Sequence, residues 1–134
     1  MITVLWYSNQ VNVYSINELG RIEMVPEVIT TIAHDAVLQV AGVSQLGEPP
    51  SALFRRSTTK GISKKDGIVL EMVDQLLKFE IYILLQSNIN MVDTCRAVQT
   101  AVVEAIDQMI GLPVESVNVH VTDVTHQFDE NRPA

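Results

Sequence analysis

The sequence has few aromatic residues, a single cysteine and no long apolar run. Aromatic residues make up 5% of its 134 residues, so the aliphatic side chains within its 47% hydrophobic content must form any core. One cysteine, Cys95, excludes an intrachain disulfide. Because a signal peptide is also missing, we expect a reducing cytoplasm. No stretch approaches the roughly 20 apolar residues that cross a bilayer, so we expect no direct membrane insertion.

Positive charge is also scarce. Nine Lys and Arg residues stand against sixteen Asp and Glu residues, and the formal net charge is −7. An acidic chain has no general attraction for phosphate backbones, which weighs against nucleic-acid binding. The exception is the basic loop 55–65, in the second half of a long connection at 42–66. Its five basic residues are Arg55, Arg56, Lys60, Lys64 and Lys65. This loop is either a solvated segment or a site for an anionic partner.

The spacing of apolar residues predicts two amphipathic helices. Between Pro26 and Gly42, apolar side chains recur every three or four residues, which is typical of a helix that buries one face. A second helix is predicted from Asn90, as its cap, to Gly111. Its apolar face comprises Val92, Cys95, Val98, Val102, Ile106 and Met109.

Strands are predicted on either side of these helices. They are "GRIEMV", "GIVLEMV", "LLKFEIYILL" and the strand that contains "VNVHV". The simplest packing is an α+β fold with a single mixed or antiparallel sheet, in β-α-β-β-α-β order, and two amphipathic helices on one face. Apolar segments near the start predict an extra N-terminal strand or hairpin. We therefore expect an N-terminal extension at 1–19, an α/β domain at 20–124 and a polar C-terminal tail at 125–134.

The last strand has one apolar and one polar face. Val117, Val119 and Val121 alternate with polar residues, and the valines are expected to face the helices. The polar residues then point to the uncovered face of the sheet, beside polar side chains of the strand at 76–85. The resulting candidate face for a partner comprises Glu80, Tyr82, Asn118, His120 and Thr122. Direct contact with a partner and simple solvation of the sheet both fit this pattern.

No motif indicates catalysis, a cofactor or a metal. His120 and His126 share a strand face, but the roughly 20 Å between them is too far for one tetrahedral ion. A glycine pair in "GVSQLGEP" resembles a Walker loop, yet Glu48 stands where the phosphate-binding lysine is required. Cys95 lies in the helix stripe, where it behaves as a small hydrophobe. We therefore expect no catalytic residues, no cofactor, no metal site and no enzyme activity.

Several motifs in order resemble the alkaline shock protein family of bacterial envelope stress response proteins. They are "GRIEMVPEVITTIA", then "VAGV", then "AVQTAVVEAIDQMIGLPVESVNVHVTDV", and they extend over residues 20–124. The family often has Tyr-Gly after its long strand, where this chain has Gln86 and Ser87. The resemblance implies a non-enzymatic cytoplasmic protein of cell-envelope homeostasis that self-associates into a homo-oligomer. It also implies a protein partner, which is either a membrane-anchored protein that holds the chain near the membrane or an enzyme of lipid metabolism.

Two functions from different classes follow. The leading hypothesis is a non-catalytic adaptor or scaffold of the envelope stress response, which acts through self-association and protein partners on the uncovered sheet face. The alternative is a nucleic-acid-binding module that uses the basic loop 55–65 and the same face. Net acidity and the lack of a G-x-x-G clamp make nucleic acid the weaker hypothesis.

Overall fold

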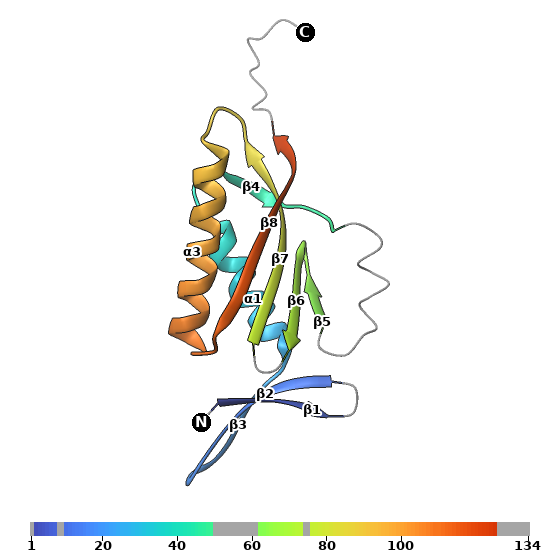
Figure 1. Cartoon of the computed structure of the whole chain (residues 1–134), viewed down its shortest axis with the longest axis vertical. Helices are drawn as coiled ribbons and strands as arrows, with labels where there is room; N and C mark the ends of the chain where they lie inside the picture. The colour runs from blue at the N-terminus through green and yellow to red at the C-terminus, as the bar shows by residue number, and fades with distance from the viewer. Residues whose placement is uncertain (1, 8–9, 50–61, 74–75, 126–134) are drawn as a thin grey trace, which may run out of the picture.

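The computed structural model describes residues 2–7, 10–49, 62–73 and 76–125, which form two sheets and two helices (Figure 1). The smaller sheet is antiparallel, with three strands: β1 (Ile2–Tyr7), β2 (Gln10–Asn17) and β3 (Gly20–Met24). The larger sheet has five strands: β4 (Val43–Leu46), β5 (Ile62–Lys65), β6 (Ile68–Val73), β7 (Leu76–Gln86) and β8 (Val114–Thr125). The helices are α1 (Pro26–Leu38) and α3 (Met91–Met109). The predicted α+β class and the N-terminal hairpin are confirmed.

Strand β7 is the centre of the larger sheet. Along one edge it pairs antiparallel first with β6 and then with the short β4. Along its other edge it pairs with β8, and this pair is parallel. The sheet is therefore mixed. Strand β8 pairs only with β7 among the described strands, so it forms one edge of the sheet.

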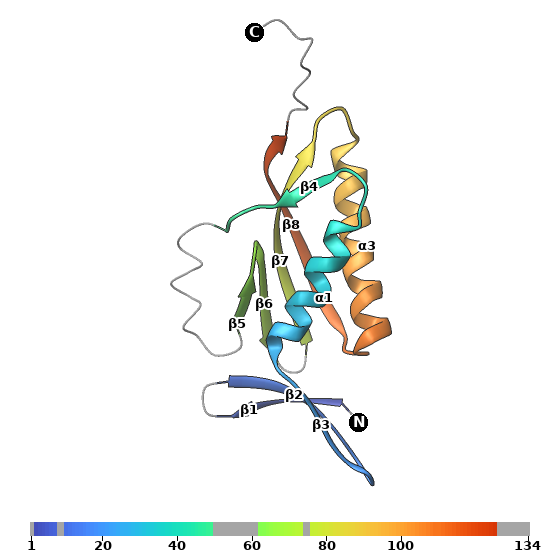
Figure 2. The same cartoon turned by 180° about the vertical axis from the view of Figure 1, so that it is seen from behind.

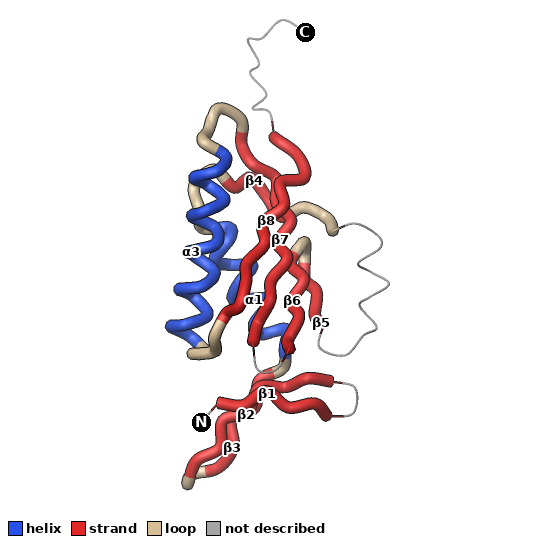
Figure 3. The backbone as a smooth tube through the Cα atoms, viewed as in Figure 1, coloured by secondary structure: helices blue, strands red, loops and turns tan. Residues whose placement is uncertain are grey.

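One core lies between the larger sheet and the two helices. Alternate side chains of β7, from Leu77 to Leu85, are fully buried on the helix side. Helix α1 contributes Ile29, Ala33 and Val37, and α3 contributes Val98, Val102 and Ile106. From behind, α1 crosses the sheet and α3 lies beside β8 (Figure 2). Neither of the two described helices covers the opposite face of the sheet, as the tube view also shows (Figure 3).

The expectation of a single sheet needs a correction. Strand β3, counted as the first strand of that sheet, pairs with β2 instead. The residue pairs Asn17–Gly20 and Ser15–Ile22 join the two strands across the expected boundary at residue 19. This three-stranded sheet lies at the end of the molecule where α1 begins (Figure 1). The expected tail falls outside the described residues, except that Thr125 ends β8.

The long connection at 42–66 is not a continuous loop. It contains β4 and β5, and β5 forms a hairpin with β6 through Asp66 and Gly67. Both turn residues have positive φ, 38° and 83°, as a two-residue hairpin turn of the right twist requires. The sequence "KKDGIV" contains this Asp-Gly signal, which the interpretation as a loop overlooked.

The helices begin as predicted but bury somewhat different faces. Asn90 caps α3, because its Oδ1 accepts a hydrogen bond from the backbone N–H of Asp93 at 3.1 Å. Val92 and Met109 were expected in the buried stripe, yet they are 60% and 67% exposed. Thr94 takes the inward position of the first turn instead. Helix α1 ends at Leu38 rather than at Gly42.

Candidate functional site

A polar cluster lies on the face of the larger sheet that the helices leave uncovered. Strands β7 and β8 run parallel, with Glu80 beside Asn118 and Tyr82 beside His120. Because side chains alternate along both strands, all four point to the same face. The structure thus brings together four of the five residues proposed for partner binding. We call Glu80, Tyr82, Asn118 and His120 the polar cluster.

Glu80 is the hub of the polar cluster. Its Oε1 accepts a hydrogen bond from Asn118 Nδ2 at 2.9 Å, and its Oε2 lies 2.5 Å from His120 Nε2. An ionised carboxylate can only accept hydrogen bonds, so Nε2 of His120 must carry the proton. The other ring nitrogen, Nδ1, has no partner among the described residues. It is therefore the group that His120 offers to a ligand or to water.

Tyr82 forms the floor beneath His120. Their ring centroids are 4.6 Å apart and the planes differ by 13°, which is a stacked arrangement. Tyr82 is only 6% exposed, whereas His120 is exposed. Burial and, secondly, the nearby Glu80 carboxylate raise the pKa of the Tyr82 hydroxyl. His120, Asn118 and Glu80 therefore make the accessible surface, and Tyr82 supports it.

Thr122 does not belong to this cluster. A register shift between β7 and β8 places Ile83 beside Val121 and Leu84 beside Asp123, so Thr122 has no direct partner on β7. Its hydroxyl donates to the backbone oxygen of Ile83 at 3.3 Å. A simple alternation of side chains could not predict this bulge.

The basic loop is only partly within the described chain. Arg55, Arg56 and Lys60 lie outside the described residues, and Lys64 and Lys65 belong to β5.

No group of three or more metal-ligating side chains occurs in the part that the structure describes. His34 is not part of the polar cluster, since it lies on α1 and contacts Asp35 and, in the β5–β6 turn, Asp66.

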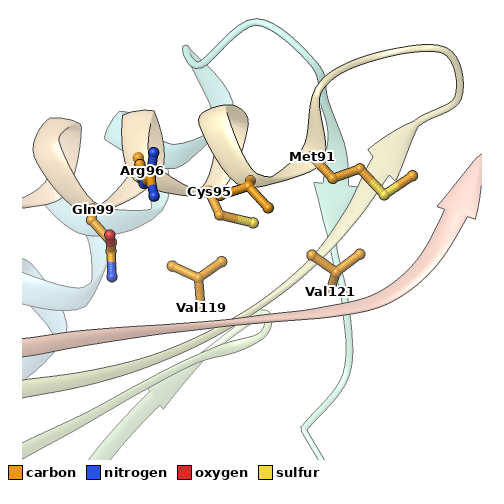
Figure 4. Close-up of a pocket in the computed structure, with 7 residues that line it drawn as sticks. Met91, Cys95, Arg96, Gln99, Val119 and Val121 are labelled. Carbon is orange, nitrogen blue, oxygen red and sulfur yellow. The ribbon is translucent and has the colours of Figure 1, made fainter.

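An apolar groove at the β8 edge was not predicted from the sequence. Side chains of α3 and β8 point toward one another across it (Figure 4). We call this pocket of about 360 Å³ the groove, and its lining residues are Met91, Val92, Cys95, Arg96, Gln99, Val119 and Val121. At one end, Gln99 Nε2 donates to the backbone oxygen of Val117 at 3.0 Å, so α3 satisfies one carbonyl of this edge strand. Beyond Gln99, the apolar side chains Val92 and Val121 remain exposed.

Cys95 lies half-buried in the groove, and burial raises the pKa of its thiol. The thiolate is the reactive form. We therefore expect Cys95 to react with iodoacetamide more slowly than glutathione at mildly alkaline pH, and its rate to rise only at higher pH. A rate–pH profile followed by mass spectrometry measures this. Equal rates for the two thiols across the profile would contradict the burial of Cys95.

The fold and these surfaces define a small α+β domain with an open polar sheet face and an apolar groove at its β8 edge. The chain belongs to the alkaline shock protein 23 family, which is described as having a cell envelope-related function and whose model matches residues 14–126. This is the family that the sequence motifs resemble, so that prediction is confirmed.

Individual relatives agree with this assignment. The chain is 25% identical to YqhY of Bacillus subtilis (strain 168) over 112 residues, which is 83% of this chain and 80% of YqhY. It is 26% identical to YloU of the same organism over 108 residues, 78% of this chain and 88% of YloU. Among solved structures, the manganese form of a MamM CTD variant matches with a TM-score of 0.46 and 18% identity, covering 75% of this chain and 98% of that one.

Neither helix in the described ranges has the length and apolar content needed to span a membrane.

Proposed function

We propose that this chain is a non-catalytic adaptor or scaffold for the cell envelope-related function of its family. It acts by binding protein partners and copies of itself, near the membrane in the cytoplasm, where a membrane-anchored protein or an enzyme of lipid metabolism is the expected partner. One observation carries the proposal: the polar cluster is held in place by its own contacts and yet faces solvent.

An ordered polar surface suits recognition of a protein. Side chains that are already fixed lose less conformational entropy when a partner binds. In the cluster, Glu80 holds Asn118 and His120, and Tyr82 stacks beneath His120. The free Nδ1 of His120 is then a directed hydrogen-bonding group. A partner surface that supplies a backbone N–H or a hydroxyl would complement it.

The same surface argues against the nucleic-acid alternative. Its central group is a carboxylate, Glu80. The ring of Tyr82 is buried beneath His120, so no base can stack on it. Acidic Glu71 on β6 and Asp123 further along β8 are also exposed. A single-stranded nucleic acid would meet negative charge where it needs a positive groove.

We expect the combined substitution of Asn118→Ala and His120→Ala to abolish recovery of protein partners in a crosslinked pull-down from the native cell. The two side chains supply most of the accessible hydrogen-bonding groups of the polar cluster. Partners are identified by mass spectrometry, and RNA is assayed in the same eluate. The fold should survive, because neither side chain is in the core.

A matched control carries Thr100→Ala with Asp107→Ala, two exposed positions of α3 away from the cluster. This variant should retain the partners of the unaltered chain. Loss of partners in both variants, or in neither, would disprove a partner site on the open face. Recovery of salt-sensitive RNA in place of proteins would favour the nucleic-acid alternative.

A further inference from the structure

The turn between β2 and β3 exposes apolar side chains in an unusual place. Ile16, Leu19 and Ile22 are 63%, 97% and 56% exposed. Ile16 pairs with Arg21, and Ser15 with Ile22, so Ile16 and Ile22 lie on opposite faces of the hairpin, with Leu19 at its end. We call residues 16–22 the hairpin tip. An apolar, protruding tip of this kind is a surface that gains stability when another surface covers it.

The groove is a second exposed apolar surface, and its shape can receive the hairpin tip. Its exposed walls are apolar, and β8 presents an edge that no described strand pairs with. Its volume of about 360 Å³ suits a few aliphatic side chains. The hairpin tip brings both apolar side chains and an edge strand, since β3 pairs only with β2 among the described strands. Addition of a strand to a free sheet edge is a common mode of protein recognition.

The two surfaces cannot meet within one molecule. The hairpin tip lies at the end of the long axis where α1 begins, and the groove lies toward the other end, where α3 begins (Figure 1). Contact between them therefore requires two copies. Because the two surfaces differ, the contact is heterologous, and each copy keeps a free tip or a free groove for the next.

Charge also favours this pairing. Glu18 at the tip has no ion-pair partner in the described part of the chain. Within the described part of the chain, the one ion pair of Arg96, at the rim of the groove, is with Asp93 at 3.8 Å, and both side chains are well exposed. Such an exposed pair contributes little to stability, so Arg96 can exchange Asp93 for Glu18 of another copy. Arg21, the one basic residue of the tip, already pairs with Glu23 at 3.5 Å, so Glu18 is the tip residue whose charge complements Arg96.

We propose that the hairpin tip of one copy docks in the groove of the next, with Leu19 between α3 and β8. The inference rests on the self-association part of the proposed function and is independent of the polar cluster. The contact is small, so we expect weak, concentration-dependent association. The assembly formed in this way is head-to-tail.

A complementation experiment tests the proposal. Leu19→Asp blocks the tip and leaves the groove intact, whereas Val92→Asp blocks the groove and leaves the tip intact. Both positions are exposed, and an acidic residue in the first turn of α3 is favoured by the helix dipole, so both variants should fold. We expect each variant alone to be monomeric by light scattering at concentrations where the unaltered chain associates. Their equimolar mixture should form a dimer and nothing larger, because only one productive contact remains.

The native thiol in the groove supplies a second readout. Alkylation of Cys95 should slow as the concentration of the unaltered chain rises, and it should not depend on concentration in either variant. Continued association of either variant alone would overturn the tip-in-groove contact while leaving self-association in place. A mixture that stays monomeric would also overturn it. An unaltered chain that is monomeric at every concentration would refute both this contact and the self-association in the proposed function.

Discussion

Replacing Gly67 with alanine is expected to destabilise the domain by on the order of 3 kcal/mol or more. Gly67 has a φ of +83°, which L-residues adopt with strain. An added Cβ would clash with the backbone oxygen of Gly47 and lie 2.9 Å from that of Tyr82. Backbone atoms of β7 and of the chain leaving β4 cannot move aside without breaking the hydrogen bond from Gly47 N to Tyr82 O. Urea unfolding followed by far-ultraviolet circular dichroism measures the loss.

Gly20→Ala is the matched control for that substitution. Gly20 also has a positive φ, +140°, but a Cβ there meets nothing within 4 Å. It therefore carries backbone strain without a clash. We expect Gly20→Ala to cost clearly less free energy of unfolding than Gly67→Ala. Equal losses would mean that the close approach of three chain segments at Gly67 does not govern stability.

The secondary structure was predictable wherever the pattern was long enough. The 19 residues of α3 and the 11 of β7 carry several periods of apolar spacing, and both were predicted. Strand β4 has only four residues, and three of its residues have partners on β7, so its alternation is too short to detect. Strand β5 was detectable through Asp66-Gly67, but the proline, glycine and basic residues of 42–66 favoured a loop.

The residues of the polar cluster could be grouped from the sequence, whereas the groove could not be predicted from it. Alternation along β8 places Asn118 and His120 on the same face, and alternation along β7 does the same for Glu80 and Tyr82. These two patterns were enough to group the four residues. The groove depends instead on strand order. Val121 sits at an apolar position that normally means core, yet it is 40% exposed because β8 is an edge strand. Strand order arises from long-range pairing, and no local pattern encodes it.

We expect Ile81→Asp to prevent folding, whereas Val119→Asp should yield a folded but weakened domain. The two side chains are neighbours on β7 and β8 and face the same side of the sheet. From sequence they are equivalent, since both occupy apolar positions in alternating strands. Ile81 is fully buried, so a carboxylate there would have no water and no partner. That penalty is comparable to the whole stability of a domain, about 5–15 kcal/mol.

Val119 differs because it is only partly buried and lines the groove. A carboxylate at this position reaches water through the open side of the groove, and Arg96 lies across from it (Figure 4). We expect a loss of about 1–3 kcal/mol, the range of an ordinary destabilising substitution. Thermal unfolding of both variants measures their losses of stability. Val121→Asp, at an exposed position on the same strand as Val119, is the reference. Val119→Asp could instead unfold the chain as completely as Ile81→Asp does. In that case the groove is closed in solution and α3 packs directly on β8. That result would also remove the docking surface proposed for the hairpin tip.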